Sequence, residues 1–214
     1  HGIIQGSNGE FDPNGQLTCA QLATILARLL KLPAGPDAGF SDIAAGAWYA
    51  DAINRCAAAG ILNGNGDGTV SPTAPITRER AMVMLGRALG IQPIENPDLS
   101  KHSDATKVSD YAQGMVAAMI EAGIVTGVDG DQIAPQDDIN RASTVTILDR
   151  AIAAYADQAG ETIKGDGKGV ILVVAENVTI TGDVDTLLVA APEAAVTLDG
   201  ANAKNVSVNG EGGK

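Results

Sequence analysis

The chain has 214 residues with 26 acidic and 14 basic side chains, so its formal net charge is −12. This balance argues against nucleic acid as a partner, because phosphates need a basic surface, and against docking on anionic lipid. No stretch reaches the roughly 18 apolar residues of a membrane-spanning helix. Hydrophobic residues make up 45 % of the chain and aromatic residues only 3 %. We therefore expect a core of alanine and aliphatic side chains in closely packed helices.

A short motif occurs three times along the chain. It consists of a glycine, two apolar residues, any residue and a second glycine, and it starts at residues 2, 60 and 123. In each copy a proline follows, and an apolar residue stands four positions after that proline. Self-similarity at intervals of 58 and 63 residues is typical of structural repeats. We therefore expect a partial first unit at residues 1–35, a second at 36–95 and a third at 96–158.

Each complete unit is predicted to be a helix, a glycine-rich loop and a second helix. Apolar residues recur at helical spacing directly before the second and third glycine motifs, and glycine commonly ends a helix. A helix is also expected after each loop, because Thr18, Thr77 and Asn140 are good N-cap residues. Gln21 completes a capping box with Thr18.

The first unit is incomplete, because no helical pattern precedes its glycine motif. A cluster of three such units would therefore have a gap. We expect upstream residues, another chain or the C-terminal tail to fill it. The apolar stripe of the first unit, which needs cover, consists of Leu22, Ile25, Leu26 and Leu29.

The glycine-rich loop of the second unit has three possible interpretations. Residues 63–68 supply one carboxylate and no closing glutamate, whereas an EF-hand calcium loop needs several acidic ligands. A Walker phosphate loop needs a Gly-Lys-Ser/Thr sequence, and this stretch has no lysine. Glycine and asparagine accept left-handed backbone angles. We therefore interpret the loop as a joint between helices and expect no metal site.

Arginine stands directly after the N-cap in the second and third units, at Arg78 and Arg141. A cation there costs roughly 0.3–1 kcal/mol, because the N-terminus of a helix carries partial positive charge. One interpretation is an exposed arginine whose stem covers apolar surface. The other is an anion site, in which the guanidinium and free backbone N–H groups bind a carboxylate or phosphate. Trp48, the only tryptophan, suits either sugar stacking or core packing.

The second unit resembles a known family. The residues that carry the likeness are Phe40-Ser41-Asp42, Trp48, Gly60-Ile61, Pro72 and Ile76-Thr77-Arg78-Glu79. They are similar to the pattern of the surface-layer homology (SLH) domain, and the resemblance extends over residues 1–158. It implies three tandem units in a pseudo-three-fold helical spindle. It also implies a secreted anchor in the cell wall or surface layer of a Gram-positive-type bacterium.

The same resemblance implies grooves between units that bind secondary cell-wall polysaccharide, in some cases pyruvylated. The groove between the second and third units would be formed by Arg78, Thr77, Glu79, Asp104 and Tyr111. A weaker groove between the first and second units would use Thr18, Asp42 and Trp48, with Cys19 in place of the arginine. Arg141 would belong to a third groove.

The composition changes after about residue 160, and residues 162–214 are rich in valine, threonine and glycine. Short apolar segments centre near Val178, Leu187, Val196 and Val206, at intervals of 9 or 10 residues. This rhythm is typical of short strands joined by turns. The fold class is therefore α+β in separate regions, and the tail is expected to be a β-solenoid. A small antiparallel meander is the alternative.

No catalytic constellation is visible, and Cys19 and Cys56 indicate either one disulfide or buried free thiols. We interpret the chain as a non-catalytic surface anchor with no cofactor, cell-wall polysaccharide as its partner and self-association as an option. A purely structural surface-layer or scaffold protein with degenerate glycan sites is one alternative. A fragment of a surface glycan-active enzyme, working with two carboxylates, is the other.

Overall fold

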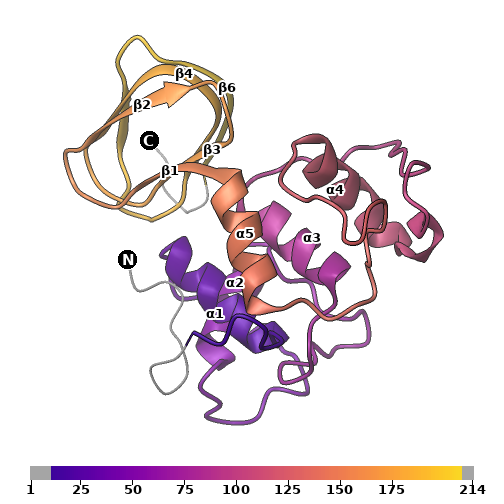
Figure 1. Cartoon of the computed structure of the whole chain (residues 1–214). Helices are drawn as coiled ribbons and strands as arrows, with labels where there is room; N and C mark the ends of the chain where they lie inside the picture. Colours follow the sequence, from indigo (N-terminus) through magenta and orange to yellow (C-terminus); the bar gives the residue numbers. More distant parts are fainter. Residues whose placement is uncertain (1–10, 209–214) are drawn as a thin grey trace.

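The computed structural model describes residues 11–208, so the first glycine motif, at residues 2–6, lies outside the described residues. Figure 1 shows a helical part and a coil of strands at one end of it. The helices are α1 (Cys19–Leu29), α2 (Ala50–Ala58), α3 (Arg78–Ala88), α4 (Asp110–Glu121) and α5 (Arg141–Ala151), with a 3-10 turn, η1 (Ala105–Lys107), before α4.

The helices begin where the capping signals predict. The Gln21 N–H donates to Thr18 Oγ1 at 3.2 Å and the Thr18 N–H donates to Gln21 Oε1 at 2.9 Å, which confirms the capping box. Asn140 caps α5, because its Oδ1 accepts from the Ser143 N–H at 2.8 Å. A glycine with positive φ follows both α2 and α4. Both helices predicted for the second unit are present as α2 and α3.

Three backbone hydrogen bonds join the units into a ring. The Leu17 N–H donates to the Ile139 carbonyl at 3.0 Å, the Ile76 N–H to Leu17 at 2.9 Å and the Ile139 N–H to Ile76 at 3.0 Å. These are the apolar residues that stand four positions after each repeated proline, and none is more than 1 % exposed. The ring gives the helical part the expected pseudo-three-fold arrangement.

The helices pack in pairs across the units. The second helix of the first unit, α1, packs against α2, and α3 packs against α4. Within residues 11–208 no helix packs against α5 to a comparable extent, and the chain passes from α5 directly into strand β1 (Ile152–Ala156). The place beside α5 is therefore the one that a leading helix of the first unit would occupy in the pseudo-three-fold arrangement.

The apolar stripe of α1 is covered, as expected. Its four members, Leu22, Ile25, Leu26 and Leu29, are all buried. Helix α2 covers one side, and residues of the strand region belong to the same core as α1. Tyr155 Oη donates to the Leu29 carbonyl and Lys31 Nζ donates to the Val174 carbonyl, both at 3.1 Å. The tail thus closes the C-terminal end of α1.

The strands form a parallel β-solenoid. They comprise β1, β2 (Thr162–Asp166), β3 (Val170–Val173), β4 (Val178–Val189), β5 (Val196–Leu198) and β6 (Asn202–Val208). Every pair among them is parallel, so the antiparallel meander is wrong. Successive turns place Thr162 beside Thr179 and Val178 beside Val196, offsets of 17 and 18 residues. Two strand segments per turn explain the interval of 9 or 10 residues.

The first strand begins earlier than the composition indicates. Strand β1 starts at Ile152, before residue 162, where we expected the β-rich segment to begin. Its sequence, IAAYA, is as alanine-rich as the helices. It becomes a strand because it pairs with the buried β3, an effect of long-range packing that overrides local propensity.

Candidate functional site

Arg78 is buried at the junction between the second and third units. Its side chain lies at the first turn of α3 and the residue is only 7 % exposed. Its Nε donates to the Ile133 carbonyl of the third unit at 3.1 Å. Burial lowers the pKa of Arg78, although Asp137 and Asp104 act in the opposite direction. The interpretation of Arg78 as an exposed arginine is therefore wrong, because the guanidinium spans the junction.

Asp104 holds the other side of the same peptide. Its two carboxylate oxygens accept from the N–H groups of Ile133 and Ala134, both at 2.8 Å, and Ala134 has a φ of +51°. Burial raises the pKa of Asp104, but the two backbone hydrogen bonds outweigh it and leave the pKa below its usual value. Asp104 thus fixes a loop in a left-handed conformation, with both oxygens occupied.

Asp42 has the same role in the second unit. Its oxygens accept from the N–H groups of Val70 and Ser71 at 3.0 and 2.7 Å, and Ser71 has a φ of +49°. Both aspartates of the family pattern therefore bind their own unit's loop.

The backbone N–H groups at the helix ends are already occupied. The Arg78 N–H donates to the Asp137 carbonyl at 2.8 Å and the Glu79 N–H to the Pro135 carbonyl at 3.0 Å. The first two N–H groups of α1 and α5 are bound in the same way by the loop of the next unit. Thr77 makes no side-chain cap. An anion site built on free N–H groups at these positions is therefore wrong.

Glu79 and Tyr111 lie together at the contact of α3 with α4. Glu79 is 3 % exposed, and its carboxylate accepts from the N–H and Oγ of Ser109 and from Tyr111 Oη at 3.2 Å. Burial is the main reason why the pKa of Tyr111 is raised to about 12. The Tyr111 side chain is otherwise accessible, with 59 % of the residue exposed.

A cavity of about 240 Å³ lies beside Arg78. Its polar lining consists of Arg78, Thr126, Asn140, Ser143, Thr146 and Arg150. Arg150, in the last turn of α5, donates from Nη1 to Thr126 Oγ1 at 3.0 Å across the cavity. The residues that line the cavity include two arginines and no carboxylate. Of the residues predicted from the sequence, Arg78 alone belongs to this set.

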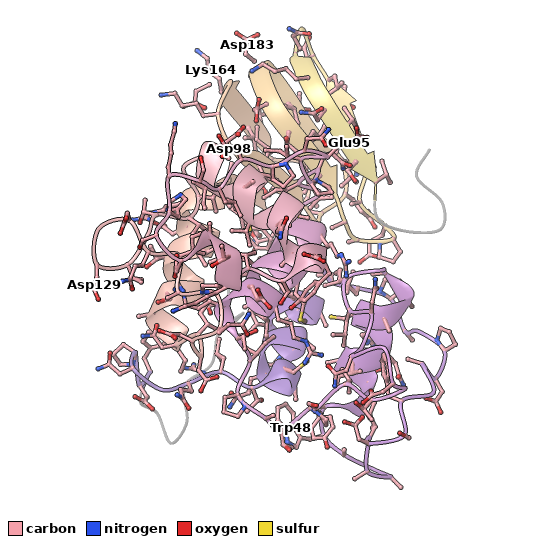
Figure 2. The ribbon with its side chains drawn as sticks, turned by 90° about the vertical axis from the view of Figure 1, so that its right-hand side faces the viewer. Trp48, Glu95, Asp98, Asp129, Lys164 and Asp183 are labelled. Atoms are coloured by element: carbon pink, nitrogen blue, oxygen red, sulfur yellow. The ribbon has the colours of Figure 1, made fainter. Side chains whose placement is uncertain are left out.

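Trp48 lines a second, larger cavity of about 590 Å³ between α1, α2 and the first strand. Three cationic residues, Arg28, Lys31 and Arg55, share this cavity with it. Trp48 is 67 % exposed, so it is not a core residue, and its ring meets Tyr49 edge-on at 5.4 Å between centroids. Figure 2 shows Trp48 far from the tip of the solenoid that carries Asp183 and Lys164.

The remaining predicted positions lie at the other two junctions. Thr18 is the N-cap of α1, and Cys19 after it is buried. Cys19 and Cys56 are both free thiols. Arg141 donates from Nε to the Phe11 carbonyl at 2.8 Å, and its guanidinium lies 5.2 Å from the centroid of the Phe11 ring. The N–H groups of Arg141 and Ala142 at the same junction donate to the carbonyls of Gly15 and Pro13 at 3.0 and 2.9 Å.

Neither a metal centre nor a membrane span is found within residues 11–208. No group of three or more histidine, cysteine, aspartate or glutamate residues there is arranged to hold a metal ion. No helix in this range is long and apolar enough to cross a bilayer.

Comparison with known proteins gives a consistent family. Residues 39–79 and 103–144 match the model of the S-layer homology domain. An amylopullulanase of Thermoanaerobacterium thermosulfurigenes is 33 % identical over 151 residues, which are 68 % of this chain and 8 % of the relative. The surface-layer 125 kDa protein of Lysinibacillus sphaericus is 30 % identical over 184 residues, 84 % of this chain and 15 % of the relative.

An S-layer protein of Bacillus licheniformis is 32 % identical over 141 residues, 66 % of this chain and 15 % of the relative. The chain thus spans at most 15 % of the length of these three relatives. The matches and the ring of helical units agree in assigning a role at the surface of a Gram-positive-type bacterium. The chain belongs to the S-layer homology domain family.

Proposed function

We propose that the chain is a non-catalytic anchoring module that binds an anionic cell-wall polysaccharide in the cavity between Arg78 and Arg150. One observation carries this proposal. In a chain with a net charge of −12, the cavity is lined by two arginines and by no acidic residue. An anionic group, such as the carboxylate of a pyruvate ketal, is the ligand that suits two guanidinium groups lining one cavity.

The geometry of Arg78 supports a bidentate contact. Within residues 11–208 only its Nε donates a hydrogen bond, so its two Nη groups keep their donors, and Arg78 is one of the residues that line the cavity. Burial restricts the side chain and thereby reduces the entropy lost on binding. Ser143 and Thr146 add hydroxyl groups for sugar recognition. The overall negative charge opposes an acidic polymer at long range, so binding depends on short-range contacts.

A purely structural role is the second candidate, and the solenoid favours it. Its last strands, β5 and β6, carry exposed apolar residues, namely Leu198, Val206 and Val208, which are 47 %, 57 % and 49 % exposed. Exposed apolar side chains on a sheet favour contact with further protein. In this case the helical units would space or assemble other domains, with self-association through the solenoid and no glycan bound.

The amylopullulanase relative raises a third candidate, an enzyme. The aligned stretch is only 8 % of that relative, and anchoring modules are commonly attached to catalytic domains. We therefore assign this chain to anchoring rather than to catalysis. An enzyme would release sugar or peptide products from wall preparations, which reducing-end analysis detects.

A pull-down with peptidoglycan sacculi separates the candidates. The full chain is mixed with sacculi that carry their polysaccharide and with sacculi from which the polysaccharide has been stripped. We expect retention on the first and loss on the second. No retention on either would favour the structural role, and equal retention on both would show that the polysaccharide is not the ligand.

A further inference from the structure

One loop carbonyl is bound by an arginine in every unit. It belongs to the residue just before a position with positive φ, namely Phe11, Val70 or Ile133. Arg78 Nε donates to the Ile133 carbonyl and Arg141 Nε donates to the Phe11 carbonyl. Both arginines are the first residue of their helix and reach into the loop of another unit.

The first junction differs, because the first residue of α1 is Cys19, which is 1 % exposed and has no charge. The Val70 carbonyl nevertheless accepts a hydrogen bond from Arg80 Nη2 at 3.0 Å. Arg80 lies on α3, so it reaches the carbonyl from its own unit and not from the preceding one. Asp42 holds the N–H side of Val70 as Asp104 holds that of Ile133.

We propose that Arg80 replaces the missing arginine of the first junction and binds an anionic group of the wall polysaccharide there. The inference rests on the proposed polysaccharide binding and adds a second contact point to it. Within the described range Arg80 uses only Nη2, so Nε and Nη1 keep their donors, and the side chain is half-buried. This leaves a charge-assisted contact with a carboxylate or phosphate open to it.

Within residues 11–208 neither neighbouring carboxylate forms an ion pair with Arg80. The nearby carboxylate of Asp42 is occupied by the Val70 and Ser71 N–H groups. That of Glu79 is occupied by Ser109 and Tyr111.

The test compares the affinity of four full-length proteins for sacculi that carry their polysaccharide. The proteins are the wild type, Arg78→Gln, Arg80→Gln and the control Lys164→Gln. Lys164 lies on the solenoid (Figure 2), and the Lys164→Gln substitution removes one positive charge, as each arginine substitution does. We expect affinity to fall about tenfold in each arginine variant and to stay unchanged in the control, with stripped sacculi as the blank. Carboxyl-reduced and dephosphorylated sacculi then show which anion Arg80 contacts.

The outcomes separate the two proposals. Weakening by Arg78→Gln but not by Arg80→Gln would overturn the role of Arg80 and leave the main cavity in place. No weakening by either would overturn both. Circular dichroism checks that each variant folds. A rescue variant then distinguishes a loss of affinity caused by the missing arginine from one caused by altered structure. Adding Cys19→Arg to Arg80→Gln should restore affinity, since it returns the arginine to the helix start, and a folded double variant that stays weak would contradict the replacement.

Discussion

The second and first junctions share a backbone design but differ in the source of their arginine. In both, an aspartate binds the N–H groups of a loop whose carbonyl accepts from a guanidinium. At the second junction Arg78 crosses from the preceding unit, whereas at the first Arg80 comes from the same unit. The comparison indicates that the aspartate and the backbone ring determine the scaffold. The arginine can be supplied from either side of a junction.

The largest expected effect is the loss of the loop aspartate. Asp104→Ala removes the acceptor for two N–H groups at a residue that is 7 % exposed. We expect a loss of roughly 2–4 kcal/mol in the free energy of unfolding, because buried N–H groups lose their partner. Asp42→Ala should cost less, about 1–2 kcal/mol, because Asp42 is more accessible. Urea unfolding measures both, and equal losses would remove the distinction between the junctions.

Replacing the two arginines should lower the free energy of unfolding in the same order, with the larger loss at the second junction, but each loss should be smaller than that for the aspartate of the same junction. Arg78→Ala removes a charged donor from the buried Ile133 carbonyl, and we expect a loss of about 1.5–3 kcal/mol. Arg80 is half-buried, so Arg80→Ala should cost only about 0.5–1.5 kcal/mol. Thermal unfolding of the two variants tests the order. A larger loss for Arg80→Ala would contradict the idea that Arg78 is the more integral of the two.

The stability of the folded chain should depend on pH through the carboxyl group of Asp104. Its pKa in the folded chain lies below the usual value of about 3.9 for an unfolded aspartate. The stabilisation is therefore complete above that unfolded value and disappears as pH falls through the lowered folded pKa. In Asp104→Asn this part of the pH dependence should vanish. Urea midpoints measured between pH 6 and pH 2 give this pH dependence, and Asp42→Asn is the matched variant. If the midpoint of Asp104→Asn depends on pH as strongly as that of the wild type, Asp104 does not titrate as described.

The smallest effect concerns the thiol that stands in place of an arginine. Cys19 and Cys56 are buried, and burial raises the pKa of both, that of Cys56 to about 12. Neither should react with a thiol reagent at pH 8 in the native protein, since the thiolate is the reactive form. Two thiols should react in denaturant. Rapid native labelling of Cys19 would show that the first junction is open, unlike the second.

The sequence predicted the repeat, the helices, the capping box and the solenoid, because each depends on local periodicity or on a short motif. It also predicted that Arg78 is a special position. It did not predict that Arg78 is buried, since its partner, Ile133, is 55 positions away and belongs to another unit. No local signal marks that contact.

The prediction that the N–H groups at the helix ends are free is wrong for a related reason. Their partners are carbonyls of the next unit, which only the closed ring brings into range. Arg150 was missed because an arginine in the last turn of a helix has an ordinary explanation, the helix dipole. Its pairing with Arg78 around one cavity appears only in the folded chain.

Arg150→Gln offers the most direct test of the polysaccharide site. Arg150 is exposed, and its side chain bonds only to Thr126 within residues 11–208, so the change should leave stability unaltered. Titration of the full chain with purified wall polysaccharide should show about tenfold weaker binding for Arg150→Gln than for the wild type, with Lys164→Gln unchanged. A folded Arg150→Gln protein that binds as tightly as the wild type would contradict the assignment of this cavity as the binding site.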